Sequence, residues 1–119
     1  MLALQELAGR YEKPLFISEN GLGAIDTVGE NHTINDIYRI QYMKGQRAIE
    51  NGVNLFGYTM WGPIDIVSNG TGQMSKRYGI IYVDLDDNGH GTGKRYKKRS
   101  YDWYKKVIAS NGEELSIEK

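Results

Sequence analysis

The sequence predicts an α/β protein in which strands and helices alternate along the chain. Residues 4–11 place apolar side chains at helical spacing, and this helix must end before Pro14. Residues 15–18 form a short apolar run typical of a buried strand, residues 34–50 predict a second helix, and residues 53–60 a second strand with alternating apolar side chains. Strands separated by helices pair in parallel through right-handed crossovers. We therefore expect these two strands to be parallel.

The segment between the first strand and the second helix, residues 21–33, is predicted to be a long loop containing three glycines. Loops of this length in compact domains are often functional, and this one is expected to lie over Glu19. Asn35 or Thr33 is expected to cap the following helix. That helix carries a stripe that we expect to pack in the core rather than to bind a ligand, namely Tyr38, Tyr42, Gly45 and Ile49.

The last third of the chain predicts a strand, a turn and a helix. Residues 78–83 have the composition of a third strand, residues 86–93 that of a polar turn region, and residues 99–110 that of an amphipathic helix ended by Gly112. One face of this helix carries Tyr101, Tyr104 and Ile108. The basic run at residues 94–99 invites a nucleic-acid interpretation, but a solvated loop fits a neutral chain better.

Length and composition limit the classes of protein to which this chain can belong. At 119 residues the chain is predicted to be a single partial domain, 1–119, well short of the roughly 250 residues of a closed α/β barrel. The helix predicted at residues 4–11 has no N-cap residue, which suggests that the chain begins inside an element that was once longer. Basic and acidic residues number 15 each, so neither nucleic acid nor an anionic membrane is an expected partner. The lack of Cys excludes thiolate metal sites and, with no apparent signal peptide or membrane span, leads us to expect a cytoplasmic location.

A carboxylate at a strand tip is the main candidate for chemistry. Glu19 follows the first apolar run and precedes Gly21, and in α/β folds substrates bind at the carboxyl ends of strands. Trp61 follows the second strand, and an indole beside a carboxylate suits a sugar, whose apolar face stacks on the ring. The alternatives are a plain strand-end acid at Glu19 and a buried structural anchor at Trp61. The tripeptide Glu-Asn-Gly at residues 19–21 recurs at residues 50–52. The second copy follows a predicted helix and is expected to be the end of that helix.

Two segments closely resemble family 1 glycoside hydrolases, which are retaining β-glycosidases built on a (β/α)8 barrel. They are PLFISENGLG at residues 14–23 and TMWGPIDIVS at residues 59–68. The resemblance implies that the chain is the C-terminal part of such a TIM barrel, about its last two βα units, and hence an incomplete barrel. It also implies that Glu19 is the nucleophile, with Asn20 as its companion at the sugar. It makes Trp61 the platform under the sugar ring and implies no metal or organic cofactor.

The segment after the second strand resembles the 6-phospho-β-glucosidase branch of that family. The commoner glucosidases carry a Glu followed by a Trp where this chain has Ser68 and Asn69. A carboxylate repels a 6-phosphate, whereas a hydroxyl donates to it, and Lys76 and Tyr78 add a cation and a phenol. The resemblance therefore implies that these four residues bind the phosphorylated sugar, with Arg77 a further candidate. Without the resemblance, the adjacent charges of Lys76 and Arg77 are typical of a solvated turn.

A retaining glycosidase needs a second carboxyl group as acid and base, and the sequence does not visibly supply it. In the family it belongs to an Asn-Glu pair on an earlier strand. Neither Glu30 nor Glu50 has that setting, and the resemblance gives Asp65 a structural part. The predicted function is hydrolysis of 6-phospho-β-D-glucosides, with this chain supplying the nucleophile and the phosphate-binding residues. The alternative is an inactive fragment that binds a carbohydrate phosphate or oligomerises, and we expect association with another copy or a complementary barrel fragment because strand edges lack partners.

Overall fold

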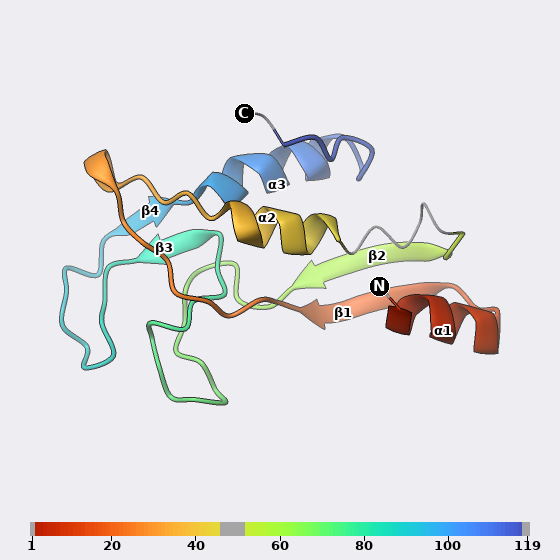
Figure 1. Cartoon of the computed structure of the whole chain (residues 1–119), viewed down its shortest axis with the longest axis horizontal. Helices are drawn as coiled ribbons and strands as arrows, with labels where there is room; N and C mark the ends of the chain where they lie inside the picture. Colours follow the sequence, from red (N-terminus) through yellow and green to blue (C-terminus); the bar gives the residue numbers. More distant parts are fainter. Residues whose placement is uncertain (1, 46–51, 118–119) are drawn as a thin grey trace.

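The structure, a computed structural model, describes residues 2–45 and 52–117. Within these ranges helices and strands alternate as predicted, and the helix expected at residues 4–11 is confirmed (Figure 1). In chain order the elements are α1 (Leu2–Tyr11), β1 (Leu15–Asn20), the short 3-10 helix η1 (Glu30–His32), α2 (Ile37–Lys44), β2 (Leu55–Met60), β3 (Ile81–Val83), β4 (Arg95–Lys97) and α3 (Arg99–Ala109). None of the described helices is long and apolar enough to cross a membrane.

β1 and β2 form the parallel pair that the sequence predicts. Leu15 lies opposite Leu55 at the start of the pair, and Asn20 lies opposite Met60 at its end. The pairing continues one residue beyond β2, where the Trp61 amide donates to the Asn20 carbonyl at 2.8 Å. Both strands therefore end at the same place, which brings the residues that follow them together.

The third predicted strand is shorter than expected, and a fourth was not predicted. β3 begins at Ile81 rather than at Tyr78, and it pairs antiparallel with β4. Gly79 lies outside β3 because its amide donates to the Asp65 carboxylate at 2.9 Å instead of to a neighbouring strand. β4 lies within the basic run at residues 94–99, so the expectation of a solvated loop there is wrong. Lys98 in particular is only 1% exposed.

The second helix is also shorter than predicted. α2 begins at Ile37, later than expected, and the predicted helix end at residues 50–52 lies largely outside the described residues. Its buried side chains are Arg39, Ile40 and Met43. Of the predicted stripe, Tyr42 is half-buried and packs against the core as expected, Tyr38 is half-buried, and Ile49 lies outside the described residues. The buried face therefore includes a charged residue, which apolar periodicity does not reveal.

The start of α2 is capped by neither of the expected residues. Its N-cap is Asp36, whose carboxylate accepts from the Arg39 guanidinium at 2.6 Å and from the Ser100 amide at 2.8 Å. The Thr33 hydroxyl donates to the Glu30 carbonyl at 2.8 Å, which ties it to η1. The side chain of Asp36 thus joins α2 to the start of α3 rather than satisfying the amides of its own helix.

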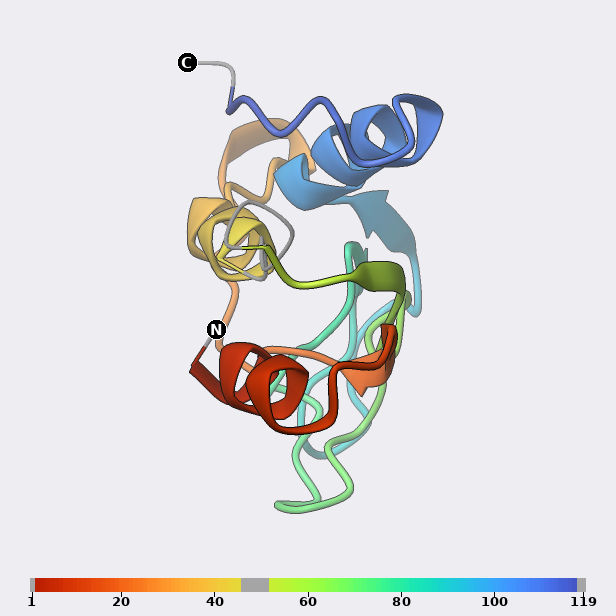
Figure 2. The same cartoon turned by 90° about the vertical axis from the view of Figure 1, so that its right-hand side faces the viewer.

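The core lies between the helices α2 and α3 and the segment leading into β3. Its buried members are Ile40, Met43, Ile80 and Trp103. Both views show α2 and α3 side by side (Figures 1 and 2). The helix predicted at residues 99–110 is confirmed as α3. Of the three residues named on one of its faces, Tyr101 and Tyr104 pack against the core, whereas Ile108 is 65% exposed. Gly112, at a φ of 84°, ends the helix as predicted, because its amide donates to the Val107 carbonyl.

The molecule is open for its length. Its Cα radius of gyration is 15.7 Å, whereas a compact chain of this size has about 13.5 Å. Phe16 on β1 and Phe56 on β2 are 48% and 68% exposed, with ring centroids 5.5 Å apart. The strand predicted as buried at residues 15–18 is therefore open on one face in this chain. α1 lies next to β1 and apart from the other two helices (Figure 2).

Candidate active site

The tip of β1 carries the predicted nucleophile. β1 ends in Glu19 and Asn20, and the Glu19 side chain is exposed. Asn20 is half-buried, because its Oδ1 accepts from the Tyr58 hydroxyl at 3.2 Å and its carbonyl accepts from the Trp61 amide. These bonds to β2 hold the backbone at the strand tip and leave the Glu19 carboxylate open to solvent.

Trp61 stands at the tip of β2, beside the loop that leaves β1. Its side chain is partly free, since 37% of the residue is exposed. A Cβ atom at Gly21 would lie 3.2 Å from Trp61 Cβ and 3.3 Å from Tyr78 Cδ1. Gly21 therefore lies against both aromatic side chains, and three segments that are distant in the sequence meet two residues after Glu19.

Ser68, Lys76 and Tyr78 lie close together. Ser68 is buried, and its Oγ is 3.4 Å from the Tyr78 hydroxyl. Lys76 Nζ is 6.0 Å from the centroid of the Tyr78 ring. The hydrogen bond with Ser68 and the nearby Lys76 ammonium hold the pKa of the Tyr78 phenol below its usual value. Asn69 is exposed next to Ser68. The group offers hydroxyl and ammonium donors of the kind that a phosphate dianion accepts.

Arg77 does not join this group of donors. It is only 5% exposed, and its guanidinium donates to the Asp65 carboxylate at 3.1 Å and to the Val83 and Leu85 carbonyls at 2.8 Å each. The phosphate role considered for Arg77 is therefore replaced by a structural one. Asp65 has the structural part that the family resemblance implies, since it also accepts from the Gly79 amide.

A buried network of charges lies behind these loops and was not predicted. Lys98 Nζ is 2.5 Å from Asp26 Oδ2 and 2.7 Å from Asp65 Oδ1, and none of the three side chains is exposed. The Arg39 guanidinium donates to Asp26 at 3.2 Å and to the Arg77 carbonyl at 2.9 Å. Burial raises the pKa of Asp26, but the Lys98 charge and hydrogen bonds outweigh burial and hold that pKa below its usual value. The network connects the loop after β1, the segment after β2 and the residue before α3.

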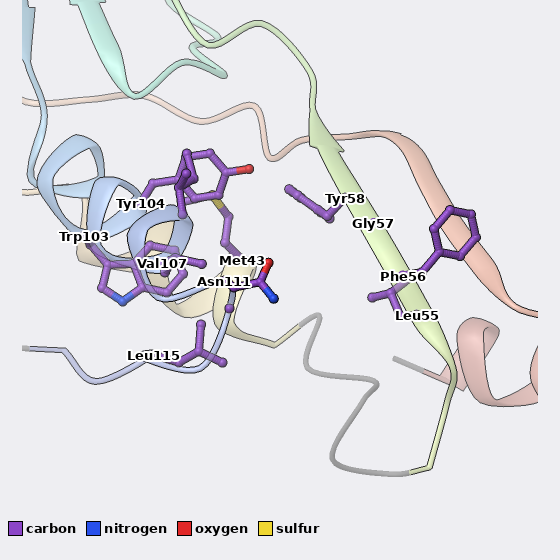
Figure 3. Close-up of a pocket in the computed structure, with 12 residues that line it drawn as sticks. Met43, Leu55, Phe56, Gly57, Tyr58, Trp103, Tyr104, Val107, Asn111 and Leu115 are labelled. Atoms are coloured by element: carbon purple, nitrogen blue, oxygen red, sulfur yellow. The ribbon is translucent and has the colours of Figure 1, made fainter.

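A separate apolar cavity of about 520 Å³ lies between β2 and α3 (Figure 3). Its wall residues include Met43, Leu55, Tyr58, Trp103, Tyr104 and Val107. Neither a carboxylate nor any of the predicted site residues lines it. The cavity therefore offers a surface for packing rather than a place for chemistry.

Metal-binding geometry is absent from the part of the chain that the structure describes, where no group of three or more His, Asp or Glu side chains is placed to hold an ion. Three acids lie at close spacing in or just before the polar turn, namely Asp84, Asp86 and Asp87. Each accepts a hydrogen bond from a backbone amide. Hydrogen bonds from the Thr92 hydroxyl and amide hold the pKa of the Asp84 carboxyl below its usual value, and the backbone amides of His90 and Ser75 do the same for the pKa values of Asp86 and Asp87. Asp86 therefore stabilises its own turn, whereas Asp84 and Asp87 connect this region to Thr92 and Ser75.

The comparisons with known proteins identify the family of this chain. The sequence profile of Glycosyl hydrolase family 1 matches residues 2–113, and the chain belongs to this family. The aryl-phospho-beta-D-glucosidase BglH of Bacillus subtilis (strain 168) is 56% identical over 119 residues, which cover 96% of this chain and 25% of that protein. The 6-phospho-beta-glucosidase of Clostridium longisporum is 56% identical over 123 residues, covering 96% of this chain and 26% of that protein.

The solved structures point to the same fold. The family 1 b-glucosidase from Thermotoga maritima, in complex with isofagomine lactam, matches with a TM-score of 0.75 at 38% identity, covering 95% of this chain and 26% of that one. The chain thus spans about a quarter of the length of the relatives that it matches. Since the family is built on a TIM barrel, the fold of this chain matches part of one.

Proposed function

We propose that this chain is part of a retaining β-glycosidase, in which Glu19 is the nucleophile. Its carboxylate attacks the anomeric carbon as the bond to the aglycone oxygen breaks, the aglycone takes a proton from the acid/base, and a covalent glycosyl-enzyme forms that water then hydrolyses. Asn20 contacts the sugar beside Glu19, and Trp61 stacks under the ring. The geometry that supports these roles is the shared end of β1 and β2, where an exposed carboxylate stands beside a partly exposed indole. In the complete barrel, β1 and β2 are the last two strands.

The proposed substrates are 6-phospho-β-D-glucosides. The single observation that carries this choice is the cluster of Ser68, Lys76 and Tyr78 next to the loop that follows Glu19. Each provides a donor, Asn69 adds an amide, and Ser68 replaces the Glu whose carboxylate would repel a phosphate. The two bacterial relatives are named for phosphorylated β-glucosides, which supports the same substrate class. Such a charged sugar does not cross membranes freely, which fits the proposed cytoplasmic location.

The acid/base is proposed to come from the part of the barrel outside this chain. The buried acids Asp26 and Asp65 are fully occupied, since both pair with Lys98 and each also accepts from an arginine. An acid/base must exchange a proton with the leaving group and with water, which a buried carboxylate held by two cations does poorly. The isolated chain is therefore expected to lack significant hydrolase activity.

A second candidate is a non-enzymatic module that binds a carbohydrate phosphate or associates with other chains. Exposed apolar surface favours it, because Phe16, Phe56 and the cavity beside β2 have no cover within the described residues. In those residues β1 and β2 also pair only with each other. A further copy, or a complementary barrel fragment, is the proposed partner, since open strand edges and apolar faces promote association.

The function is tested in a chimera, in which residues 2–113 replace the matched segment of the Bacillus subtilis aryl-phospho-beta-D-glucosidase. We expect the chimera to hydrolyse 4-nitrophenyl 6-phospho-β-D-glucoside with a kcat/KM at least about tenfold above that for the unphosphorylated glucoside, since one charge-assisted hydrogen bond contributes about 1.5–3 kcal/mol. Glu19→Gln should abolish turnover of both substrates. Glu113→Gln, at an exposed position near the end of the matched segment, is the matched control and should change neither.

Two outcomes contradict the proposal. A folded chimera without hydrolase activity would show that this segment does not supply a working nucleophile. A chimera that hydrolyses both substrates equally well would support the glycosidase activity but refute the proposed role of Ser68, Lys76 and Tyr78 in binding a 6-phosphate. Binding of glucose 6-phosphate by the isolated 119-residue chain, together with a folded but inactive chimera, would favour the second candidate.

A further inference from the structure

Gly23 lies directly against the phenol of Tyr78. A Cβ atom at position 23 would be 2.6 Å from Tyr78 Cζ and 2.9 Å from both its Cε1 and its hydroxyl oxygen. Contacts this short are far inside the van der Waals distance of about 3.5–4.0 Å, so a side chain there and the present ring position exclude each other. Gly23 has no positive φ, so backbone conformation does not explain the glycine. The glycine is explained by the Tyr78 ring, which occupies the space that a side chain at position 23 would need.

The backbone cannot easily move apart to make room. The residues next to Gly23 and Tyr78 form a two-way bridge, in which the Ala24 amide donates to the Arg77 carbonyl and the Arg77 amide donates to the Ala24 carbonyl, both at 2.9 Å. The Arg77 carbonyl also accepts from the Arg39 guanidinium at 2.9 Å. Separating the two segments would break these bonds, so a side chain at position 23 would displace the phenol instead.

The phenol is the part of Tyr78 that the proposed phosphate group uses. Its hydroxyl is 3.4 Å from Ser68 Oγ, and the Lys76 ammonium lies 6.0 Å from the ring centroid. Ser68 is 1% exposed, and its backbone is held by hydrogen bonds with Gln73 at 2.9 Å and Gly72 at 2.7 Å, so it is not free to follow a displaced ring. Displacement of the phenol by a side chain at position 23 therefore changes the geometry between the tyrosine and serine hydroxyls and disrupts the donor cluster.

We propose that Gly23 is a specificity-determining residue, whose missing side chain allows the Tyr78 phenol to lie on the loop after Glu19 and to complete the 6-phosphate site. This inference rests on the function proposed above. It adds that phosphate recognition depends on the loop of the nucleophile as well as on the residues that bind the phosphate. A larger residue at position 23 would weaken recognition of the phosphate while leaving Glu19 and Trp61 in place.

The test is the Gly23→Ala variant of the chimera, assayed on the phosphorylated and the unphosphorylated 4-nitrophenyl glucoside. We expect kcat/KM for the phosphorylated substrate to fall roughly 10- to 100-fold, mainly through KM, as on losing one charge-assisted hydrogen bond. The unphosphorylated substrate should change less than about threefold, since distant contacts are unaffected. Gly9→Ala is the matched control, because a Cβ at that helical glycine meets nothing within 4 Å.

A double-mutant cycle with Tyr78→Ala separates this role from a general effect on the loop. Once the ring is removed, Gly23→Ala should cause no further loss on the phosphorylated substrate. If Gly23→Ala alone fails to fold, the double variant should fold, because the clash is gone. Equal losses on both substrates, additive losses in the cycle, or a double variant that remains unfolded would each overturn the proposal.

Failure of this inference is distinguishable from failure of the proposed function. An unaltered chimera that prefers the phosphorylated substrate upholds the proposed function whatever Gly23→Ala does. A crystal structure of the Gly23→Ala chimera gives an independent readout. We expect the Tyr78 ring to have left its position over residue 23, and an unmoved ring would overturn the inference even if activity had fallen.

Discussion

Lys98 is the position at which the structure makes its sharpest prediction about stability. Its ammonium group bridges Asp26 at 2.5 Å and Asp65 at 2.7 Å, with all three side chains fully buried. Lys98→Met keeps most of the side-chain volume but removes the charge. The variant therefore leaves two buried carboxylates with one cation fewer.

The expected cost follows from what remains around each carboxylate. Breaking a buried ion pair by removing one partner costs about 3–5 kcal/mol. Asp26 retains Arg39, and Asp65 retains Arg77 and the Gly79 amide, so the lower end of that range applies. A loss of about 3 kcal/mol is a large fraction of the roughly 5–15 kcal/mol that stabilises a typical domain.

The assay is urea unfolding of the 119-residue chain at pH 7, with Lys105→Met as the matched control. Lys105 lies on α3 and is exposed, so its replacement should change stability by less than about 0.5 kcal/mol. Equal effects of the two substitutions at pH 7 would refute the reasoning, since they would show that the buried network stabilises nothing.

The pH dependence gives the same prediction a second readout. The folded pKa of Asp26 lies below its unfolded value, so ionised Asp26 contributes stability above the unfolded pKa of about 3.9. That contribution is lost as pH falls through the folded pKa. In Lys98→Met the carboxyl loses the charge that depresses its pKa, so the difference between variant and unaltered chain should shrink from pH 7 towards pH 3. A difference that is constant over this range would contradict the assignment.

Three further predictions concern the site and the open surface. In the chimera, Lys76→Ala should lower kcat/KM for the phosphorylated glucoside roughly 10- to 100-fold and hardly affect the unphosphorylated one; equal losses would leave Lys76 a structural role. The isolated chain should show negligible turnover, since an absent acid/base alone removes a factor of roughly 10²–10⁴, and near-family rates abolished by Glu19→Gln would prove this wrong. The isolated chain should also associate, which light scattering after size exclusion detects, whereas a monomer at high concentration with cooperative unfolding would argue against it.

The elements that bring the site together could be predicted from the sequence. The paired strands follow from two apolar runs separated by a helical pattern, and the helix at residues 99–110 follows from its periodicity and from Gly112. These signals are local, because they depend on the spacing of apolar residues and on residues that end helices. Family resemblance then assigned roles to Glu19, Trp61 and Ser68 that periodicity alone left open.

The charge network could not be predicted, because its partners are distant in the sequence. Lys98 belongs to a run of basic residues, and a run of like charges is usually solvated. Its burial depends on Asp26 and Asp65, which arrive from loops after two different strands. Neither loop has a pattern that fixes where its carboxylate points. The same holds for Arg39, whose place on the buried face of α2 depends on Asp26 and Asp36 rather than on helical periodicity.

The contact between Gly23 and Tyr78 also could not be predicted from the sequence. A glycine in a loop has several explanations, including a turn, a positive φ or a close approach. Only the three-dimensional structure shows that a ring from a segment more than fifty positions later fills the space of its side chain. Sequence patterns thus located the candidate residues, whereas the structure shows which of them depend on one another.

The central claim is that this chain carries the nucleophile of a glycosidase specific for 6-phosphorylated sugars. The most direct test is to trap the covalent intermediate in the chimera with an aryl 2-deoxy-2-fluoro-β-glucoside 6-phosphate, whose fluorine slows hydrolysis of the glycosyl-enzyme. Mass spectrometry of the digested protein should find the phosphorylated sugar on the peptide that contains Glu19, with far slower labelling by the unphosphorylated reagent. A label on any other carboxylate, or equal labelling by both reagents, would contradict the claim.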